Sequence, residues 1–286
     1  MNHSSYLDDR GVRDFLHWMA PLVSGERPLH HRWDSPKKGW GPWSCASLFG
    51  AYEAYDWPFT AKVPGELSPR RGHSYDDTVE ILKALTEQLR RSAAVQDAPT
   101  FLEAAVGVVR WGGVFNNEAR LRVLGTNALL ALTTAARQLE PTVADLGDLA
   151  KVIDMNSGFS KIYSLLNDGF PIYDSRVACA LASLVRLYCE ESNLAEVPKT
   201  LAFGIPASRG SVSRDPSTAT FRFPRLRAGQ PQHYAVSNIK AAWLMGALAA
   251  MPPFGTLANT TPLFALESAL FMIGYAPINA LDHAAG

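Results

Sequence analysis

Cysteine is scarce in this sequence, and the few cysteines are not spaced as metal ligands. Only three occur among 286 residues, namely Cys45, Cys179 and Cys189. Their odd number argues against a disulfide framework, and the lack of a C-x-x-C pair argues against a zinc or iron–sulfur site. We therefore expect reduced thiols in a cytoplasmic protein.

Long apolar runs and targeting segments are also missing. The N-terminal residues, MNHSSYLDDRGVRDFLHW, include early acidic residues and no apolar stretch of signal-peptide length. The most apolar segment, AAWLMGALAA at 241–250, is far shorter than the roughly 20 residues that a membrane-spanning helix needs. The sequence thus predicts neither secretion nor contact with a membrane.

Neither sign of charge is in excess, and cofactor motifs are lacking. The 27 Lys+Arg balance the 27 Asp+Glu, which argues against binding of nucleic acid or anionic membrane through overall charge. Gly39 and Gly41 only flank a tryptophan and form no phosphate-binding loop. His30, His31 and His73 do not follow the spacing of metal ligands. We expect no cofactor and no metal.

Helical periodicity is what the sequence does contain, from residue 76 onward. Residues 76–95 place Val79, Leu82 and Leu89 on one face of a helix. The same period, with caps and breakers at its ends, predicts further helices over 101–114, 117–140, 144–155, 159–167, 174–191, 238–251 and 261–274. No substantial strand pattern interrupts them, so the fold class is predicted to be mostly α.

The first 75 residues differ from the rest in composition. They contain many glycines and prolines and five tryptophans: Trp18, Trp33, Trp40, Trp43 and Trp57. Short helices are predicted at 12–23 and 46–55. We expect residues 1–75 to form a Trp-rich segment that packs on a helical domain, residues 76–286. Residues 207–232, rich in Ser, Pro, Gly and Arg, are predicted to form a long loop.

The most informative pattern lies in residues 155–181, MNSGFSKIYSLLNDGFPIYDSRVACAL. It places Lys161 early in a short helix and Asp174 at the start of the next one. Each residue alone has an ordinary structural interpretation, because Asp is a standard N-cap and a helical Lys is usually solvated. The arrangement of the two residues suggests a functional site.

This stretch resembles the helix-hairpin-helix DNA glycosylases, most closely the branch with the 8-oxoguanine DNA glycosylase fold. In that family a turn between two short helices grips the DNA backbone, a Lys follows early in the second helix, and an Asp caps the next helix. Here Asn156, Ser157 and Gly158 are similar to the turn, Lys161 to the Lys and Asp174 to the Asp.

The resemblance extends over roughly residues 100–250, where WGG at 111–113 and NIKAAW at 238–243 are similar to helical segments of bacterial members. It implies two packed helical lobes with a helix-hairpin-helix-like element, the hairpin and active site lying within 145–190. Two features depart from the family. The turn keeps only Gly158 of the usual Leu-Pro-Gly-hydrophobic-Gly pattern, and the interval from Lys161 to Asp174 is more than one helical turn shorter.

The resemblance implies excision of a modified base from double-stranded DNA, with Asp174 and Lys161 as catalytic residues. A carboxylate near C1′ stabilises the positive charge that develops on the sugar. A neutral Lys amine can attack C1′ and form a Schiff base, which gives an associated lyase activity. If the short interval turns Lys161 away, Asp174 would instead activate water and the enzyme would be monofunctional.

DNA contacts are expected from the hairpin and from the basic loop that begins near Arg209. The predicted DNA-binding residues are Asn156, Ser157, Gly158, Arg176, Arg214, Arg222, Arg225, Arg227 and Lys240. A flipped base needs aromatic and amide side chains around it. The predicted base-pocket residues are Trp111, Asn116, Asn117, Tyr173, His233 and Trp243.

Several alternatives remain open at the level of sequence. The family precedent suggests an oxidised purine, whereas the divergent hairpin and the Trp-rich segment leave room for a bulky base such as a hypermodified cytosine of phage DNA. The role is then repair or antiviral defence, by a monomer. The competing hypotheses are a catalytically inactive module that binds modified DNA or a partner protein, and a helical scaffold with no role on nucleic acid.

Overall fold

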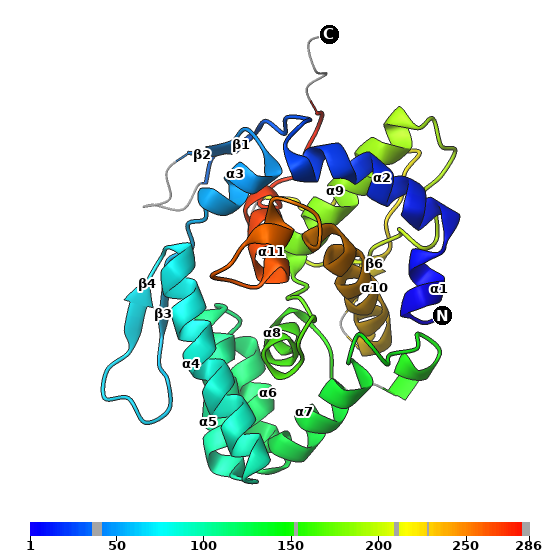
Figure 1. Cartoon of the computed structure of the whole chain (residues 1–286). Coiled ribbons are helices and arrows are strands. Elements are labelled where there is room, and N and C mark those ends of the chain that lie inside the picture. The colour runs from blue at the N-terminus through cyan, green and yellow to red at the C-terminus, as the bar shows by residue number, and fades with distance from the viewer. Residues whose placement is uncertain (36–41, 152–153, 209–211, 228, 282–286) are drawn as a thin grey trace.

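The computed structural model describes residues 1–35, 42–151, 154–208, 212–227 and 229–281. These residues form a mostly helical protein, which confirms the predicted class (Figure 1). The α-helices are α1 (His3–Leu7), α2 (Arg10–Ser24), α3 (Leu48–Glu53), α4 (Tyr75–Ala94), α5 (Ala98–Trp111), α6 (Asn116–Leu124), α7 (Asn127–Gln138), α8 (Ser157–Leu166), α9 (Ser175–Glu191), α10 (Pro231–Ala249) and α11 (Pro262–Ile273). Two short 3-10 helices are η1 (Asp148–Lys151) and η2 (Phe254–Thr256).

Strands are short and occur in pairs within the described residues. β1 (His31–Trp33) pairs antiparallel with β2 (Trp43–Cys45), and β3 (Phe59–Ala61) pairs antiparallel with β4 (Arg70–Gly72). β5 (Ile205–Pro206) and β6 (Arg225–Leu226) form a two-residue parallel pair. The predicted loop 207–232 is therefore anchored through β6 and ends where α10 begins.

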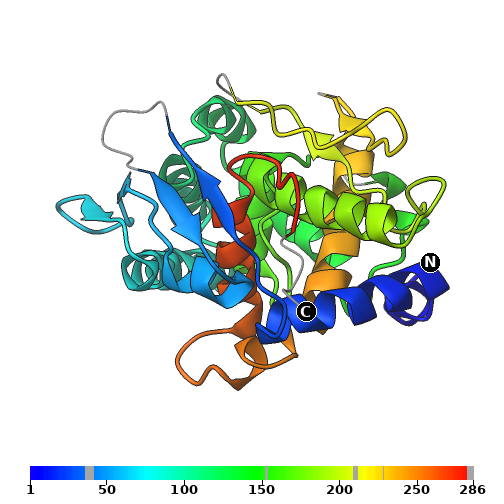
Figure 2. The same cartoon turned by 90° about the horizontal axis from the view of Figure 1, so that it is seen from above.

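The helices pack in two groups with α8 between them. In the first group α5 contacts α4, α6, α7 and α8, and in the second group α11 contacts α9, α10 and α3 (Figure 1). The first 75 residues are divided between the groups, because α1 and α2 pack on α10 whereas β3 packs on α5. Trp33 ties the segment to α11, since its Nε1 donates to the Met272 carbonyl at 2.8 Å. Seen from above, α2 runs along one side of the second group (Figure 2).

Three helix boundaries differ from the prediction. The predicted helix 117–140 is broken at Gly125, whose φ of 54° lies in the left-handed region that glycine tolerates. Within the described part of the predicted helix 144–155, the helical residues are those of η1. The predicted helix 238–251 starts earlier than expected, since α10 begins at Pro231, and proline suits the first turn of a helix.

Within the residues that the structure describes, no helix combines the length and the apolar character needed to cross a membrane.

The three cysteines are unpaired, and Cys179 and Cys189 lie in the core. Burial raises the pKa of the Cys179 thiol to about 12, which makes it a poor nucleophile.

Candidate active site

The short helix α8 begins with a side-chain cap at Asn156. Its Oδ1 accepts hydrogen bonds from the backbone N–H groups of Gly158 at 2.8 Å and Phe159 at 3.1 Å. Gly158 is packed so closely that an added Cβ would lie 2.2 Å from Nδ2 of Asn117. The amide of Gly158 is thus already bonded within the protein, and the DNA contacts of Asn156, Ser157 and Gly158 stay a prediction.

Lys161 lies one turn into α8 and is almost fully buried. Its side chain is 5% exposed, and its Nζ donates to the Ser157 carbonyl at 3.3 Å and to Asp174 Oδ2 at 3.2 Å. The end of α5 makes room for the stem, because an added Cβ on Gly112 would lie 2.4 Å from Cδ of Lys161. The shorter sequence interval does not turn Lys161 away from Asp174.

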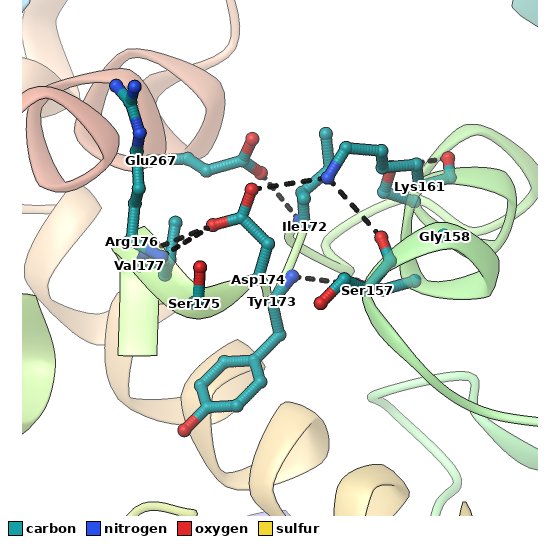
Figure 3. Close-up of polar contacts among 12 residues, drawn as sticks. Ser157, Gly158, Lys161, Ile172, Tyr173, Asp174, Ser175, Arg176, Val177 and Glu267 are labelled. Atoms are coloured by element: carbon teal, nitrogen blue, oxygen red, sulfur yellow. Dashed lines mark hydrogen bonds and ion pairs between the residues drawn. The ribbon is translucent and has the colours of Figure 1, made fainter. Parts of the chain in front are cut away.

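Asp174 is the N-cap of α9 and the ion-pair partner of Lys161 (Figure 3). Its Oδ1 accepts from the backbone N–H groups of Arg176 at 2.9 Å and Val177 at 3.2 Å. Burial alone would raise the pKa of this carboxyl group. The charges of Lys161 and Arg176 and the two backbone hydrogen bonds outweigh burial, so the pKa is lowered and Asp174 is a carboxylate at neutral pH.

A buried hydrogen-bond network holds the segment that leads to Asp174. The Ser160 hydroxyl accepts from Tyr173 N at 2.6 Å and donates to Asn238 Oδ1 at 2.9 Å. The Asn238 amide in turn donates to the Pro171 carbonyl at 3.0 Å. Because Ser160 belongs to α8 and Asn238 to α10, the network fixes Asp174 relative to both helices.

Glu267 is a site residue that the sequence analysis missed. It lies on α11, is 7% exposed, and its Oε2 accepts from Ile172 N at 2.7 Å (Figure 3). Burial, assisted by the charge of Asp174, raises its pKa to about 8, against smaller lowering effects from the Ile172 hydrogen bond and Lys161. The available signal was a single acid in the otherwise apolar helix pattern of residues 261–274.

Lys161, Asp174 and Glu267 line one cavity of about 1160 Å³. Four aromatic residues that were not predicted also line it: Tyr55, Trp57, Phe264 and Phe271. An ion pair between Arg120 and Asp154 lies on the same wall. The cavity thus joins charged groups from α8, α9 and α11 to an aromatic surface.

Three of the predicted base-pocket residues line this cavity, namely Trp111, Asn116 and Asn117. Asn116 is exposed, whereas Asn117 is buried and donates to the Val114 carbonyl at 3.3 Å. Trp111 is 7% exposed, and its buried Nε1 has no hydrogen-bond partner among the described residues. A buried donor without a partner is unusual, because it costs free energy.

The other three predicted base-pocket residues do not line the cavity, and their assignment is corrected. Tyr173 is fully buried, and its hydroxyl donates to the Gly204 carbonyl at 2.7 Å. Trp243 is a core residue whose Nε1 donates to the Pro141 carbonyl at 2.8 Å. His233 lies exposed in the first turn of α10, away from the cavity walls.

Arg176 is buried, which corrects its assignment to the DNA backbone, whereas Lys240 is half-buried and its assignment stays a prediction. The Arg176 guanidinium is 4.8 Å from the Trp57 ring centroid and 4.4 Å from that of Phe271, and the residue is 6% exposed. The Arg176 side chain is part of the cavity lining. Lys240 donates to the Lys199 carbonyl at 2.9 Å and lies outside the cavity walls.

Two of the remaining predicted arginines line the cavity and two do not. Arg214 lines it and donates to the Ser175 hydroxyl at 3.1 Å, and Arg227 lines it while remaining exposed. Arg222 is exposed, and Arg225 pairs with an aspartate, Asp215, at 3.0 Å. Arg209 lies outside the described residues.

Comparison with known proteins yields no relative: no protein-family model, no curated protein and no solved structure matches the chain. The resemblance to DNA glycosylases therefore stays a prediction from sequence motifs.

Within the part of the chain that the structure describes, no group of three or more His, Cys, Asp or Glu side chains could hold a metal ion.

Proposed function

We propose that this protein is a DNA glycosylase that excises a modified base by cleaving its N-glycosidic bond. The observation that carries the proposal is the buried pair of Lys161 Nζ and Asp174 Oδ2, 3.2 Å apart on the wall of a cavity of about 1160 Å³. Buried ion pairs in a cavity are typical of catalytic sites. On this proposal the two helix groups are the two lobes of the glycosylase fold, and η1 and α8 are the helices of its hairpin element.

Asp174 supplies the electrostatic part of the proposed reaction. Cleavage of the N-glycosidic bond leaves positive charge on the sugar, and a carboxylate fixed near C1′ stabilises that charge without reorganising. Asp174 meets this requirement because two backbone N–H groups and Lys161 keep it ionised and in place.

Lys161 supplies the nucleophile. Its amine attacks C1′ while the bond to the base breaks, and the product is a Schiff base between the enzyme and the opened sugar. Attack requires the neutral amine, so the ammonium must first lose a proton. Solvent that enters the cavity accepts this proton, because Asp174 must remain a carboxylate to stabilise the charge on the sugar.

The cavity supports a bulky base as substrate. Its volume of about 1160 Å³ exceeds the roughly 300–1,000 Å³ of ordinary small-molecule pockets. Aromatic side chains in its lining offer stacking surfaces for such a base. These features favour a hypermodified base, such as one found in phage DNA, over a base with a small lesion.

Release of free base tests the proposal. Duplexes with oxidised, deaminated, alkylated or glucosylated bases are incubated with the protein, and released base is identified by mass spectrometry. Asp174→Asn retains the helix cap but removes the charge, so base release is expected to fall by roughly 100-fold or more. Asp168→Asn, on an exposed side chain, is the matched control and retains activity.

One observation favours the second candidate, a module that binds modified DNA without cleaving it. Lys161 Nζ already contacts both the Ser157 carbonyl and Asp174, as an ion pair with a purely structural role would. Tight binding to one modified duplex, with no base released from any duplex, would establish this candidate in place of the glycosylase.

A further inference from the structure

The cavity contains a second buried carboxyl group that the chemistry of Lys161 and Asp174 does not use. Glu267 projects from α11 toward the segment that carries Asp174, and only its Oε2 is engaged, by Ile172 N at 2.7 Å (Figure 3). Its Oε1 makes no hydrogen bond to any described residue, although the side chain lines the cavity. Glu267 therefore has one oxygen held by the backbone and one free to meet a ligand.

The two carboxyl groups of this site are in opposite protonation states at neutral pH. Asp174 is ionised, because its pKa is lowered by Lys161, Arg176 and two backbone N–H groups. Glu267 is largely protonated, because burial and the nearby Asp174 charge raise its pKa to about 8. Environments that shift the pKa values of two nearby carboxyl groups in opposite directions are typical of sites that need both an acid and a base.

Base excision needs such an acid. When the bond between C1′ and the base nitrogen breaks, its electron pair goes to the base, which leaves as an anion unless a proton arrives. A positioned general acid accelerates such a step by roughly 100-fold to 10,000-fold. Neither Lys161 nor Asp174 can serve, because the first must be a neutral amine and the second must be a carboxylate.

We propose that Glu267 is the general acid that protonates the base as it leaves, an inference that rests on the proposed glycosylase function. The proton moves from Glu267 Oε1 to the base, the electron pair of the C1′–N bond moves to the base nitrogen, and Lys161 Nζ bonds to C1′. Glu267 becomes a carboxylate and takes its next proton from solvent in the cavity. Ile172 N keeps the carboxyl group in place throughout.

The charged and titratable groups around Glu267 come from every element that packs on this side of α11. They are Lys161, Asp174, Arg176, Tyr55 and Tyr75. Burial raises the pKa of both tyrosines above their ordinary value, and the pKa of Asp174 is lowered. Arg176 has its pKa lowered to about 10 by burial. A difference in pH dependence between wild type and a Glu267 variant, with a midpoint near pH 8, therefore reports Glu267.

The test is the pH dependence of base release in a single turnover, measured from about pH 6 to about pH 10 with saturating protein. The ratio of the wild-type rate to the rate of Glu267→Gln is expected to fall about tenfold per pH unit above about pH 8, because the loss of a proton from Lys161 affects both rates alike. Glu267→Gln keeps an acceptor for Ile172 N but has no acid proton. It should be slower than wild type by roughly 100-fold at pH 7, and this difference should shrink above about pH 8. Glu87→Gln, an exposed substitution on α4, is the control and should retain the wild-type profile.

A second measurement shows whether Glu267 acts as a general acid or only holds the Ile172 backbone in place. A base with an electron-withdrawing substituent leaves easily without a proton, so Glu267→Gln should remove it at close to the wild-type rate. Equal slowing of both bases would show that Glu267 only holds Ile172, and an unchanged rate in Glu267→Gln would also overturn the proposal. Both results leave the glycosylase function intact. If wild-type protein releases no base at any pH, the proposed function fails and this inference fails with it.

Discussion

At the scale of single residues, the account depends on the Lys161–Asp174 ion pair. Removal of one partner from a buried pair leaves an uncompensated charge and costs roughly 3–5 kcal/mol. Lys161→Met and Asp174→Asn are each expected to destabilise the fold by about this amount, as measured by urea unfolding. The double variant should lose less than the sum of the two, because neither charge then remains buried alone. Strictly additive losses would show that the two side chains are not coupled.

Residue-level chemistry could be predicted only where local sequence determines it. Asp174 was recognisable as a cap from its place before a helix, and the family resemblance suggested that it acts together with Lys161. Glu267 was not recognisable, since its burial depends on α11 packing against α9 and α3, which lie far away in sequence. Trp111 and Trp243 were both predicted to line the base pocket, but only Trp111 lines the cavity. Packing between distant segments decides this, so the sequence could not distinguish the two residues.

At the scale of elements, the end of α5 positions α8 through a close contact. A methyl group on Gly112 would lie 2.4 Å from Cδ of Lys161, so Gly112→Ala is expected to displace the ammonium from Asp174. Base release should fall by roughly tenfold or more, since small misplacements at a catalytic centre are costly. Gly246→Ala is the matched control, because its Cβ would meet no atom within 4 Å. It should gain roughly 0.5–1 kcal/mol of stability by urea unfolding. Full activity in Gly112→Ala would contradict the packing argument.

Helix ends were predictable where a cap or a breaker lies in the local sequence. The predicted helix 76–95 closely matches α4, whose capping box at Ser74 and Asp77 fixes its start. The break at Gly125 was missed because the periodic pattern continues on both sides of it. The two-residue pair of β5 and β6 joins residues 20 positions apart, so no local pattern indicates it.

At the scale of the whole molecule, zero net charge means that DNA affinity must come from local cations. Arg222 and Arg227 are exposed, and Arg227 lines the cavity mouth. Replacement of both by Gln should lower the slope of log affinity against log salt by about two, because each phosphate contact contributes roughly 0.9. Lys83→Gln, on the exposed face of α4, is the control. An unchanged slope, measured by fluorescence anisotropy, would place the DNA elsewhere on the surface.

Covalent trapping tests the central claim most directly. Wild-type protein is incubated with the panel of modified duplexes in the presence of borohydride, which reduces a Schiff base to a stable adduct, while abasic sites are counted in parallel. We predict an adduct on at least one duplex, mapped to Lys161 by mass spectrometry and lost in Lys161→Gln. Abasic sites without an adduct would assign the attack to water activated by Asp174. Absence of both products on every duplex would contradict the account.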